Sequence, residues 1–405
     1  MATDERRAAD DLEPLDWDDL GARRRRVPKR LVAAVLGIAG LLAVKYGLGV
    51  DPVYDWSPSN LTWVYRASVI VLVSFGVPPL VTNWHQTKRY VRRLLARPRG
   101  LVSFVLTAAF VLVGLFGPVV AGRPHTNAMY TFQPPVFGTV PKGTVALNCV
   151  GDVVGTAVNP TCTGSWQFPL GTTKIGQDMV TLLVSGLHVS LQVAVVAAVL
   201  MIPIATAVGV VAGYFGGYVD DVLMRYVDVQ QAVPAFVVYI VLVFVLGPSL
   251  LLLVVVFGLL NWGSIARLVR SETIQRRQEQ YVEVARSAGV GHGTIVQRHI
   301  LPNVSNSILV GTTQKIPQLI LIETALTYID LGDVGRWFQS FGDTIASGFA
   351  GTMGSTLIQG NLGGHSPLVI WWIWVLPVVA LSITVLALTV LGDVLRDVLD
   401  PRGAR

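Results

Sequence analysis

The sequence predicts an all-α integral membrane protein, and three observations support this fold class. Apolar residues make up 52% of the 405 residues and charged residues only 14%, whereas soluble domains carry about a quarter charged residues. The mean hydropathy is +0.57. The apolar residues also gather in charge-poor runs of about 20, the length of helix that crosses a hydrocarbon core of about 30 Å.

Eight such runs are predicted membrane spans. Two of them are separated only by Gly247-Pro248-Ser249, which favours a tight turn over one very long helix. The span at 304–322 is the most polar, so we expect it to lie among other helices or along a watery pathway. In chain order the spans are residues 31–50, 67–84, 101–121, 189–213, 229–246, 250–266, 304–322 and 368–391.

Basic residues in the connecting segments predict the orientation in the membrane. The segments expected on one side contain 24 Lys and Arg residues, most densely at 1–30, 85–100 and 267–303, whereas the segments on the other side contain five. This imbalance predicts a multi-pass protein of the plasma membrane with both termini in the cytoplasm. It also accounts for the net charge of +6 without nucleic-acid binding.

The N-terminal segment 1–30 is predicted to be a disordered cytoplasmic tail. Residues 1–20 contain eight acidic residues and two arginines, a composition that stays solvated. The apolar run that follows has features of a signal peptide, but it begins 30 residues into the chain and is long enough to span. We therefore expect a retained anchor helix.

Both cysteines, Cys149 and Cys162, lie in the predicted outward loop 122–180. Thiols outside the cell tend to oxidise, so a disulfide is expected, with two unpaired thiols as the alternative. Closing so short a loop would stabilise the fold by about 3 kcal/mol in the chain-entropy account.

Common catalytic motifs are absent from the sequence. There is no Gly-Lys pair and so no phosphate-binding loop of the Walker A type. No histidine is followed by Glu, which removes the HExxH zinc motif, and there is no GxSxG elbow. We expect no catalysis, no metal and no cofactor in this chain.

The segment 280–302 is the most informative part of the sequence. Residues 279–288 favour a short helix, Gly289-Val290-Gly291 breaks it, and a second short helix is predicted to run as far as Pro302. Small residues at the bend would allow another protein to approach closely. The residues alone leave two interpretations open, a docking element and a solvated connector.

This segment resembles the EAA loop of permease subunits from binding-protein-dependent ABC importers. That pattern is Glu-Ala-Ala, three residues, Gly, nine residues, then Ile-x-Leu-Pro, from which Val284 and His299 depart. The stretch Arg298–Asn303, RHILPN, is typical of the dipeptide, oligopeptide and nickel branch. The resemblance assigns ATPase docking to Glu283, Ala285, Ala288, Gly289, His299, Ile300, Leu301 and Pro302.

The resemblance extends over residues 101–402 and implies a six-span permease domain. Thr173 and Gln177 stand where the branch has Asp and Arg, and His188 also departs from its pattern. Residues 31–100 do not fit, so the first two spans and the basic linker that follows are interpreted as an accessory hairpin. The other matching segments are 170–178, 186–191, 221–225, 266–270, 323–326 and 391–402.

The resemblance also implies the partners. They are a second, similar permease, two ATPase subunits that bind ATP and Mg²⁺, and an extracytoplasmic solute-binding protein, all working at the lipid bilayer. The implied solute is a peptide, although the branch also takes nickel and some sugars. Transport would proceed by alternating access, with ATPase closure moving the docking loops.

Ionisable and aromatic residues in the spans complete the predictions. Glu323 is a candidate pathway residue, and Trp371, Trp372 and Trp374 are interpreted as an aromatic belt at the outer interface. The alternative function is an ion-gradient-driven secondary transporter or channel. That class usually shows charged relays or broken helices within the membrane, and this sequence predicts neither clearly.

Overall fold

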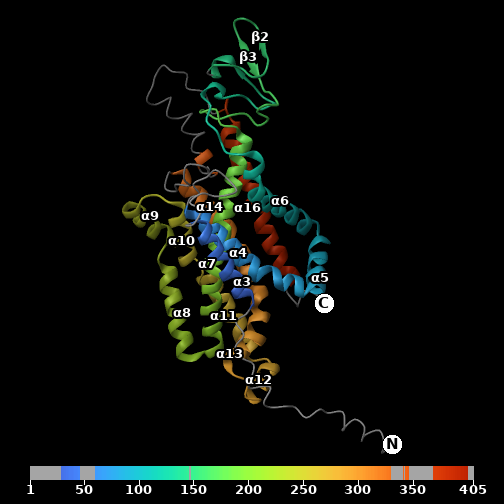
Figure 1. Cartoon of the computed structure of the whole chain (residues 1–405), viewed down its shortest axis with the longest axis vertical. Coiled ribbons are helices and arrows are strands. Elements are labelled where there is room, and N and C mark those ends of the chain that lie inside the picture. The colour runs from blue at the N-terminus through green and yellow to red at the C-terminus, as the bar shows by residue number, and fades with distance from the viewer. Residues whose placement is uncertain are drawn as a thin grey trace, which may run out of the picture.

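Helices dominate the fold, as predicted. The computed structural model describes residues 29–45, 60–145, 147–329, 341, 343–345 and 368–399. A small β-sheet lies at one end of the long axis, and the short helices α12 (Gln280–Ser287) and α13 (His292–Ile295) lie at the opposite end (Figure 1). The long helices between these ends form the bundle.

Five helical segments in the described part of the chain are long and apolar enough to cross a membrane. A sixth is added if the bent pair of helices discussed below is counted as one span. The five are α4 (Asn60–Thr82), α6 (Pro98–Ala121), α7 (Met179–Phe215), the segment Leu250–Arg277, and α16 (Trp372–Leu399). The predicted spans at 67–84, 101–121, 189–213, 250–266 and 368–391 thus overlap these segments.

Two other predicted spans correspond to helices that miss these criteria. The first is α3 (Lys29–Ala43), which is apolar but only 15 residues long. The second is α14 (Leu301–Tyr328), which is 28 residues long but too polar. Its Thr324 and Thr327 are buried. These polar side chains therefore lie among other helices, which is one of the two positions predicted for this span.

The predicted span at 229–246 corresponds to parts of two helices instead of one. The structure has α8 (Gly217–Ala232) and α9 (Ala235–Leu246), which are bent by 65° relative to each other. The bend falls at Val233-Pro234, where proline lacks the N–H that a continuing helix needs and disfavours helical geometry at the residue before it. Val233 accordingly has extended backbone angles.

The central helix of the bundle is α7. It is 37 residues long, and its small residues allow α11 (Gly263–Arg277) to approach closely. A Cβ at Gly209 would lie 2.5 Å from the Ala266 carbonyl oxygen, and one at Gly213 would lie 2.7 Å from that of Arg270. This spacing of small residues four apart is a common basis of helix packing in membranes.

Two ion pairs join α8 to α11. Arg267 Nη2 lies 2.9 Å from Asp228 Oδ1, and Arg270 contacts Asp220 through two guanidinium nitrogens. The segment Leu250–Arg277 is built from α10 (Leu250–Leu260) and α11, with a break at Asn261-Trp262. The helical span therefore extends 11 residues beyond the predicted end at residue 266.

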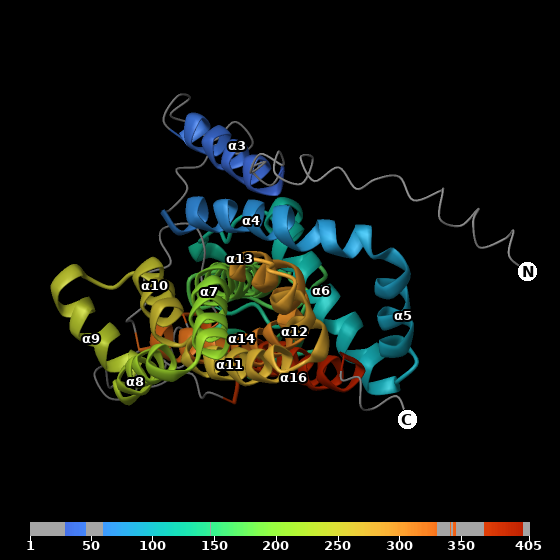
Figure 2. The same ribbon diagram turned by 90° about the horizontal axis from the view of Figure 1, so that it is seen from below.

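The first two helices form a layer against one side of the bundle. Figure 2 shows α3 outermost and α4 between α3 and the bundle, with α16 and α11 on the opposite side. The Tyr65 ring of α4 meets the His188 ring of α7 edge-on at 6.0 Å. His188 is buried, and its Nδ1 lies 2.6 Å from the Gly114 carbonyl oxygen of α6.

The segment between α6 and α7 forms a small sheet domain. Its strands β1 (Thr139–Pro141), β2 (Val153–Gly155) and β3 (Pro160–Thr163) are antiparallel and ordered β1-β3-β2. Short 3₁₀ turns, η2 (Ala128–Tyr130) and η3 (Lys142–Thr144), flank β1. Cys149 and Cys162 form a disulfide with their Cα atoms 5.7 Å apart, so the thiols are paired.

Candidate functional site: the 280–302 loop

The loop starts where α11 ends. Gln278 and Glu279 turn the chain into α12, and Arg276 Nη1 lies 3.9 Å from Glu279 Oε1. The helix α12 then ends in a Schellman motif, in which the Gly289 N–H donates to the Arg286 carbonyl at 3.0 Å and the Val290 N–H to the Ala285 carbonyl at 3.1 Å.

Gly289 makes this ending possible. Its φ is +76°, in the left-handed region that side chains with a Cβ rarely adopt. The predicted helix break at Gly289 thus coincides with a specific backbone turn. An added Cβ at Gly289 would meet no atom within 4 Å, so only the backbone angle restricts this position.

The second helix of the predicted hairpin does not end at Pro302. After α13, a π-helical segment, η4 (Val296–Ile300), leads directly into α14, and Pro302 lies in the first turn of α14. A proline in a helix lacks an N–H and crowds the carbonyl four residues earlier, here that of Arg298. The wider π turn accommodates that mismatch, so the 280–302 loop is continuous with a long bundle helix.

Buried apolar side chains fix the loop to the bundle. Val282, Ile295 and Ile300 have no exposed surface and belong to the main core. Ile300, assigned to docking by the resemblance, therefore packs within this chain and presents nothing to a partner in this conformation.

Polar contacts add to this anchoring. The Tyr214 hydroxyl at the end of α7 lies 2.9 Å from His292 Nδ1, and Arg277 donates to the Tyr214 carbonyl at 3.0 Å. The Asn303 amide donates to the His299 carbonyl at 2.6 Å and to the Tyr281 hydroxyl at 3.2 Å. These contacts tie both halves of the loop to α7 and α14.

The remaining predicted docking residues divide by exposure. Glu283, Ala288, Gly289 and Pro302 are exposed, whereas Ala285, His299 and Leu301 are half-buried against the loop's own neighbours. Val284, which occupies the central Ala position of the resembled pattern, is 67% exposed. The exposed positions of this set thus lie mainly on α12 and its C-terminal turn.

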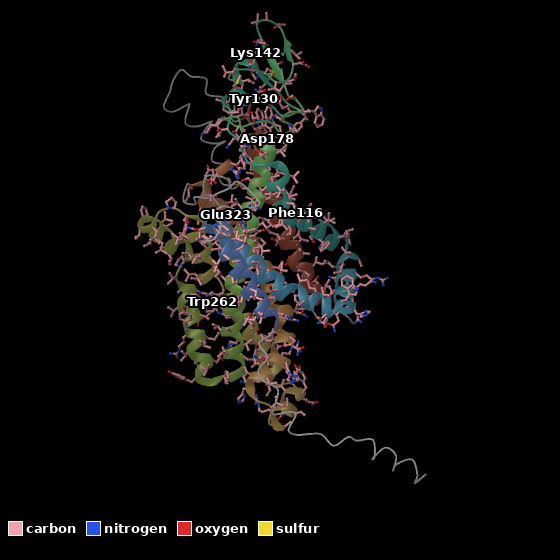
Figure 3. The ribbon with its side chains drawn as sticks, viewed as in Figure 1. Phe116, Tyr130, Lys142, Asp178, Trp262 and Glu323 are labelled. Atoms are coloured by element: carbon pink, nitrogen blue, oxygen red, sulfur yellow. A yellow bond between two sulfur atoms is a disulfide. The ribbon has the colours of Figure 1, made fainter. Side chains whose placement is uncertain are left out.

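Glu323 lies apart from this loop, within α14. Figure 3 shows it inside the bundle, between the loop end and the sheet end. The residue is 0% exposed, and the Thr324 hydroxyl donates to its carboxylate at 3.4 Å. In this conformation the chain's own helices enclose the carboxylate.

At the sheet end, Trp372 is buried rather than exposed at the membrane interface. Trp372 is buried, with 1% exposure, and its indole N–H donates to the Thr172 carbonyl at 3.0 Å. The belt interpretation is therefore wrong for Trp372, which instead joins the start of α16 to the segment before α7. Its side chain belongs to a second apolar core with Val140, Met179 and Ile373.

The segment 170–178 is held by hydrogen bonds instead of the family's charged residues. The Gln177 N–H donates to the Thr173 hydroxyl at 3.1 Å, and the Asp178 carboxylate accepts from the N–H groups of Val180 and Thr181 to cap α7. Burial raises the pKa of Asp178, and these two N–H groups partly offset the rise. Figure 3 places Asp178 at the junction of α7 and the sheet domain.

The described helices form a bundle with candidate membrane spans, with an anchored loop at one end and a sheet domain at the other, which is the architecture of a multi-span membrane protein. Residues 205–405 match the family described as the inner membrane component of binding-protein-dependent transport systems. The chain belongs to this family. It is thus a permease subunit of an importer and a multi-pass protein of the inner membrane.

Three relatives support this assignment. The chain is 33% identical over 235 residues to the dipeptide transport system permease protein DppC of Bacillus subtilis, covering 58% of this chain and 69% of that protein. It is 31% identical over 243 residues to the oligopeptide transport system permease protein OppC of Haemophilus influenzae, covering 60% and 72%. A putative peptide transport system permease protein of Brucella suis is 29% identical over 313 residues, covering 77% and 90%.

Proposed function

We propose that this chain is one of two permease subunits of an ATP-driven peptide importer and that residues 280–302 couple it to ATPase subunits. The observation that carries the coupling role is the shape of the loop. An exposed helix tip, Glu283–Gly289, is anchored by buried residues to a segment that continues into α14. A force applied to the tip would therefore reach the bundle through a rigid connection.

The chain is proposed to hydrolyse no ATP itself. ATP and Mg²⁺ would bind to the two ATPase subunits, and an extracytoplasmic solute-binding protein would deliver the solute to the sheet end. Peptides are the proposed solute because the relatives in Bacillus subtilis, Haemophilus influenzae and Brucella suis are named as peptide permeases. Glu323 would meet the solute only when the bundle opens.

We further propose eight spans with both termini in the cytoplasm, consisting of an accessory hairpin and a six-span domain at 101–402. The packing of α3 against α4 supports a paired hairpin. The Brucella suis relative aligns over more residues than the 302 of this domain. The length of that alignment is comparable to the length of the proposed domain.

The coupling role is tested with Gly289→Asp in the assembled importer. The substitution combines a strained left-handed backbone with a charge on the docking surface, where an unpaired buried charge is costly. We expect normal membrane insertion, weak retention of the ATPase subunits, and loss of most peptide uptake in vesicles.

Gly217→Asp is the matched control. Gly217 also has a positive φ, +53°, with open space around it and an exposed position, but it lies at the corner between α7 and α8. This variant should keep its ATPase subunits and its uptake. Normal uptake by the Gly289→Asp importer would leave residues 280–302 as a solvated connector.

The solute class is tested separately. The cognate binding protein is titrated with dipeptides, longer peptides, nickel chelates and oligosaccharides, and uptake of the same compounds is then measured. Peptides should bind and compete for uptake. Selective binding of nickel or of an oligosaccharide would contradict the peptide assignment and leave the coupling role untouched.

A further inference from the structure

The helix between α4 and α6 has a surface that the transport role does not use. This helix, α5 (Trp84–Leu95), packs one side against the end of α16, where Leu94 joins Val394 and Val398 in a small core. A second apolar stripe faces outward. It consists of Trp84, 60% exposed, Val91, 38% exposed, and Leu95, 37% exposed.

The positions of the three residues place them on one narrow strip. At about 100° per residue, positions 84, 91 and 95 fall within about 40° of arc on a helix. Leu94 lies on a different side, so the packing against α16 does not account for the strip. A strip this apolar would be costly to leave in water, at about 25 cal/mol for each Å².

Basic side chains occupy the rest of the exposed surface of α5: at about 100° per residue, Lys88 and Arg92 flank the strip, and Arg89 and Arg93 lie on the face away from it. Lys88, Arg89, Arg92 and Arg93 are exposed, and residues 84–96 contain no acidic residue. Within the described ranges none of the four lies in an ion pair, whereas the next arginine, Arg97, contacts Asp397 at 3.0 Å. The helix thus offers positive charge beside an apolar strip, the usual composition of a helix that lies in a membrane interface.

The position of α5 favours lipid over any other occupant. The helix is tethered at both ends to spans, with Asn83 between it and α4 and only Ala96-Arg97 between it and α6. Figure 2 shows it at the edge of the bundle, crosswise to α4. The strip is continuous along the chain with exposed apolar residues at the ends of α4 and α6, such as Leu80, Val81, Leu101 and Val102.

We propose that α5 is an interfacial helix that binds the headgroups of acidic phospholipids. Its Trp84, Val91 and Leu95 side chains lie at the boundary of the acyl chains, and its four basic side chains contact the phosphate groups. The proposed orientation of the importer is used only to name the leaflet, which would be the cytoplasmic one. Neither test below requires ATPase subunits or transport, so their failure would be distinguishable from failure of the transport role.

The first test measures lipid preference. The full chain is reconstituted in phosphatidylcholine bilayers, and spin-labelled phosphatidylglycerol is compared with spin-labelled phosphatidylcholine for the fraction immobilised by the protein. Arg89→Gln with Arg92→Gln removes two of the four basic side chains proposed to contact the headgroups, so the preference for phosphatidylglycerol should fall at least twofold at low salt. High salt should have a similar effect on the unmodified chain.

The matched control removes two other exposed arginines, Arg286 and Arg298, by substitution with Gln. This variant loses the same charge from the docking loop and should keep the lipid preference. An equal loss in both variants, or no preference in the unmodified chain, would overturn the proposal.

The second test measures the depth of the helix. A nitroxide on Trp84→Cys should be more accessible to oxygen than to a water-soluble nickel complex, and one on Arg93→Cys should show the reverse. The native cysteines are paired and will not react. Equal exposure of both positions to the nickel complex would show that α5 lies in water, free for a protein or nucleic acid, and would overturn the proposal.

Discussion

At Gly289 a single backbone angle determines how the 280–302 loop turns. The angle φ is +76° and the surrounding space is open. Gly289→Ala should therefore lower stability by about 1 kcal/mol through backbone strain alone. The effect is measured as faster hydrogen exchange of the α12 amides in detergent-solubilised protein.

Gly291→Ala provides the comparison for this prediction. Gly291 lies two residues further, with φ of −62° and equally open space. Its substitution should change stability by less than about 0.5 kcal/mol, as usual for surface positions. Equal acceleration of exchange in both variants would show that the left-handed angle is unimportant.

Trp372 provides a second prediction for a single residue. Trp372→Phe keeps an aromatic ring in the buried site but removes the N–H donor to the Thr172 carbonyl, leaving that buried acceptor without this partner. The loss should be about 1–3 kcal/mol, measured as a lower thermal midpoint. Trp166→Phe, at a side chain 81% exposed, should leave the midpoint unchanged; an equal decrease would contradict the anchoring role.

Single residues also show how far sequence reasoning reaches. Gly289 could be assigned a left-handed turn because glycine between two short helices is a local signal. Ile300 and Trp372 could not be placed, since an exposed and a buried apolar residue look alike in a sequence. Their positions depend on contacts with segments far away in the chain.

Among the elements, the sheet domain depends on its disulfide. The bridge closes a loop with a sequence separation of 13 residues, and Cys162 lies fully buried in the central strand β3. Cys149→Ser with Cys162→Ser should destabilise the domain by about 3 kcal/mol. Limited proteolysis should then cut within residues 122–180 while the helices remain protected.

Reducing the disulfide of the unmodified protein is a second way to remove the bridge. A mild reductant should produce the same cleavage, and the double variant should show no further change on reduction. Cleavage that is unaltered by both treatments would show that strand pairing and the Gln133 side chain, which bonds Asn148 and Val150, hold the domain without the bridge.

For the helices, too, features that depend on nearby residues could be predicted, whereas features that depend on contacts elsewhere could not. Each of the eight predicted apolar runs overlaps a helix in the described part of the chain, because length and hydropathy are local properties. The bend between α8 and α9 and the continuation of η4 into α14 were missed. Pro234 follows an extended residue between two helices, whereas Pro302 lies in the first turn of a helix. The residue type alone does not distinguish these settings.

For the whole molecule, the accessory hairpin should be separable from the transport domain. Deleting residues 1–84 removes an even number of proposed spans, so the remaining chain should keep its orientation. It should be less stable, since the deletion uncovers His188 and the side of α7 that Tyr65 contacts. We expect ATPase binding at a reduced level; complete loss from a correctly inserted domain would make the hairpin part of the coupling machinery.

The orientation of the whole molecule can be tested with single cysteines, because the two native cysteines are paired. The probes are Arg92→Cys on α5, Arg286→Cys on α12 and Lys142→Cys in the sheet domain, all at exposed positions. The excess of Lys and Arg on one side predicts that a membrane-impermeant thiol reagent added to intact cells labels only position 142. Positions 92 and 286 should react only after the membrane is opened. Because α5 and the docking loop are separated by an even number of proposed spans, they must react alike. Labelling of position 286 from outside would reverse the orientation and remove the docking loop from the compartment that contains ATP, whereas labelling of 92 alone would show an odd number of spans between them.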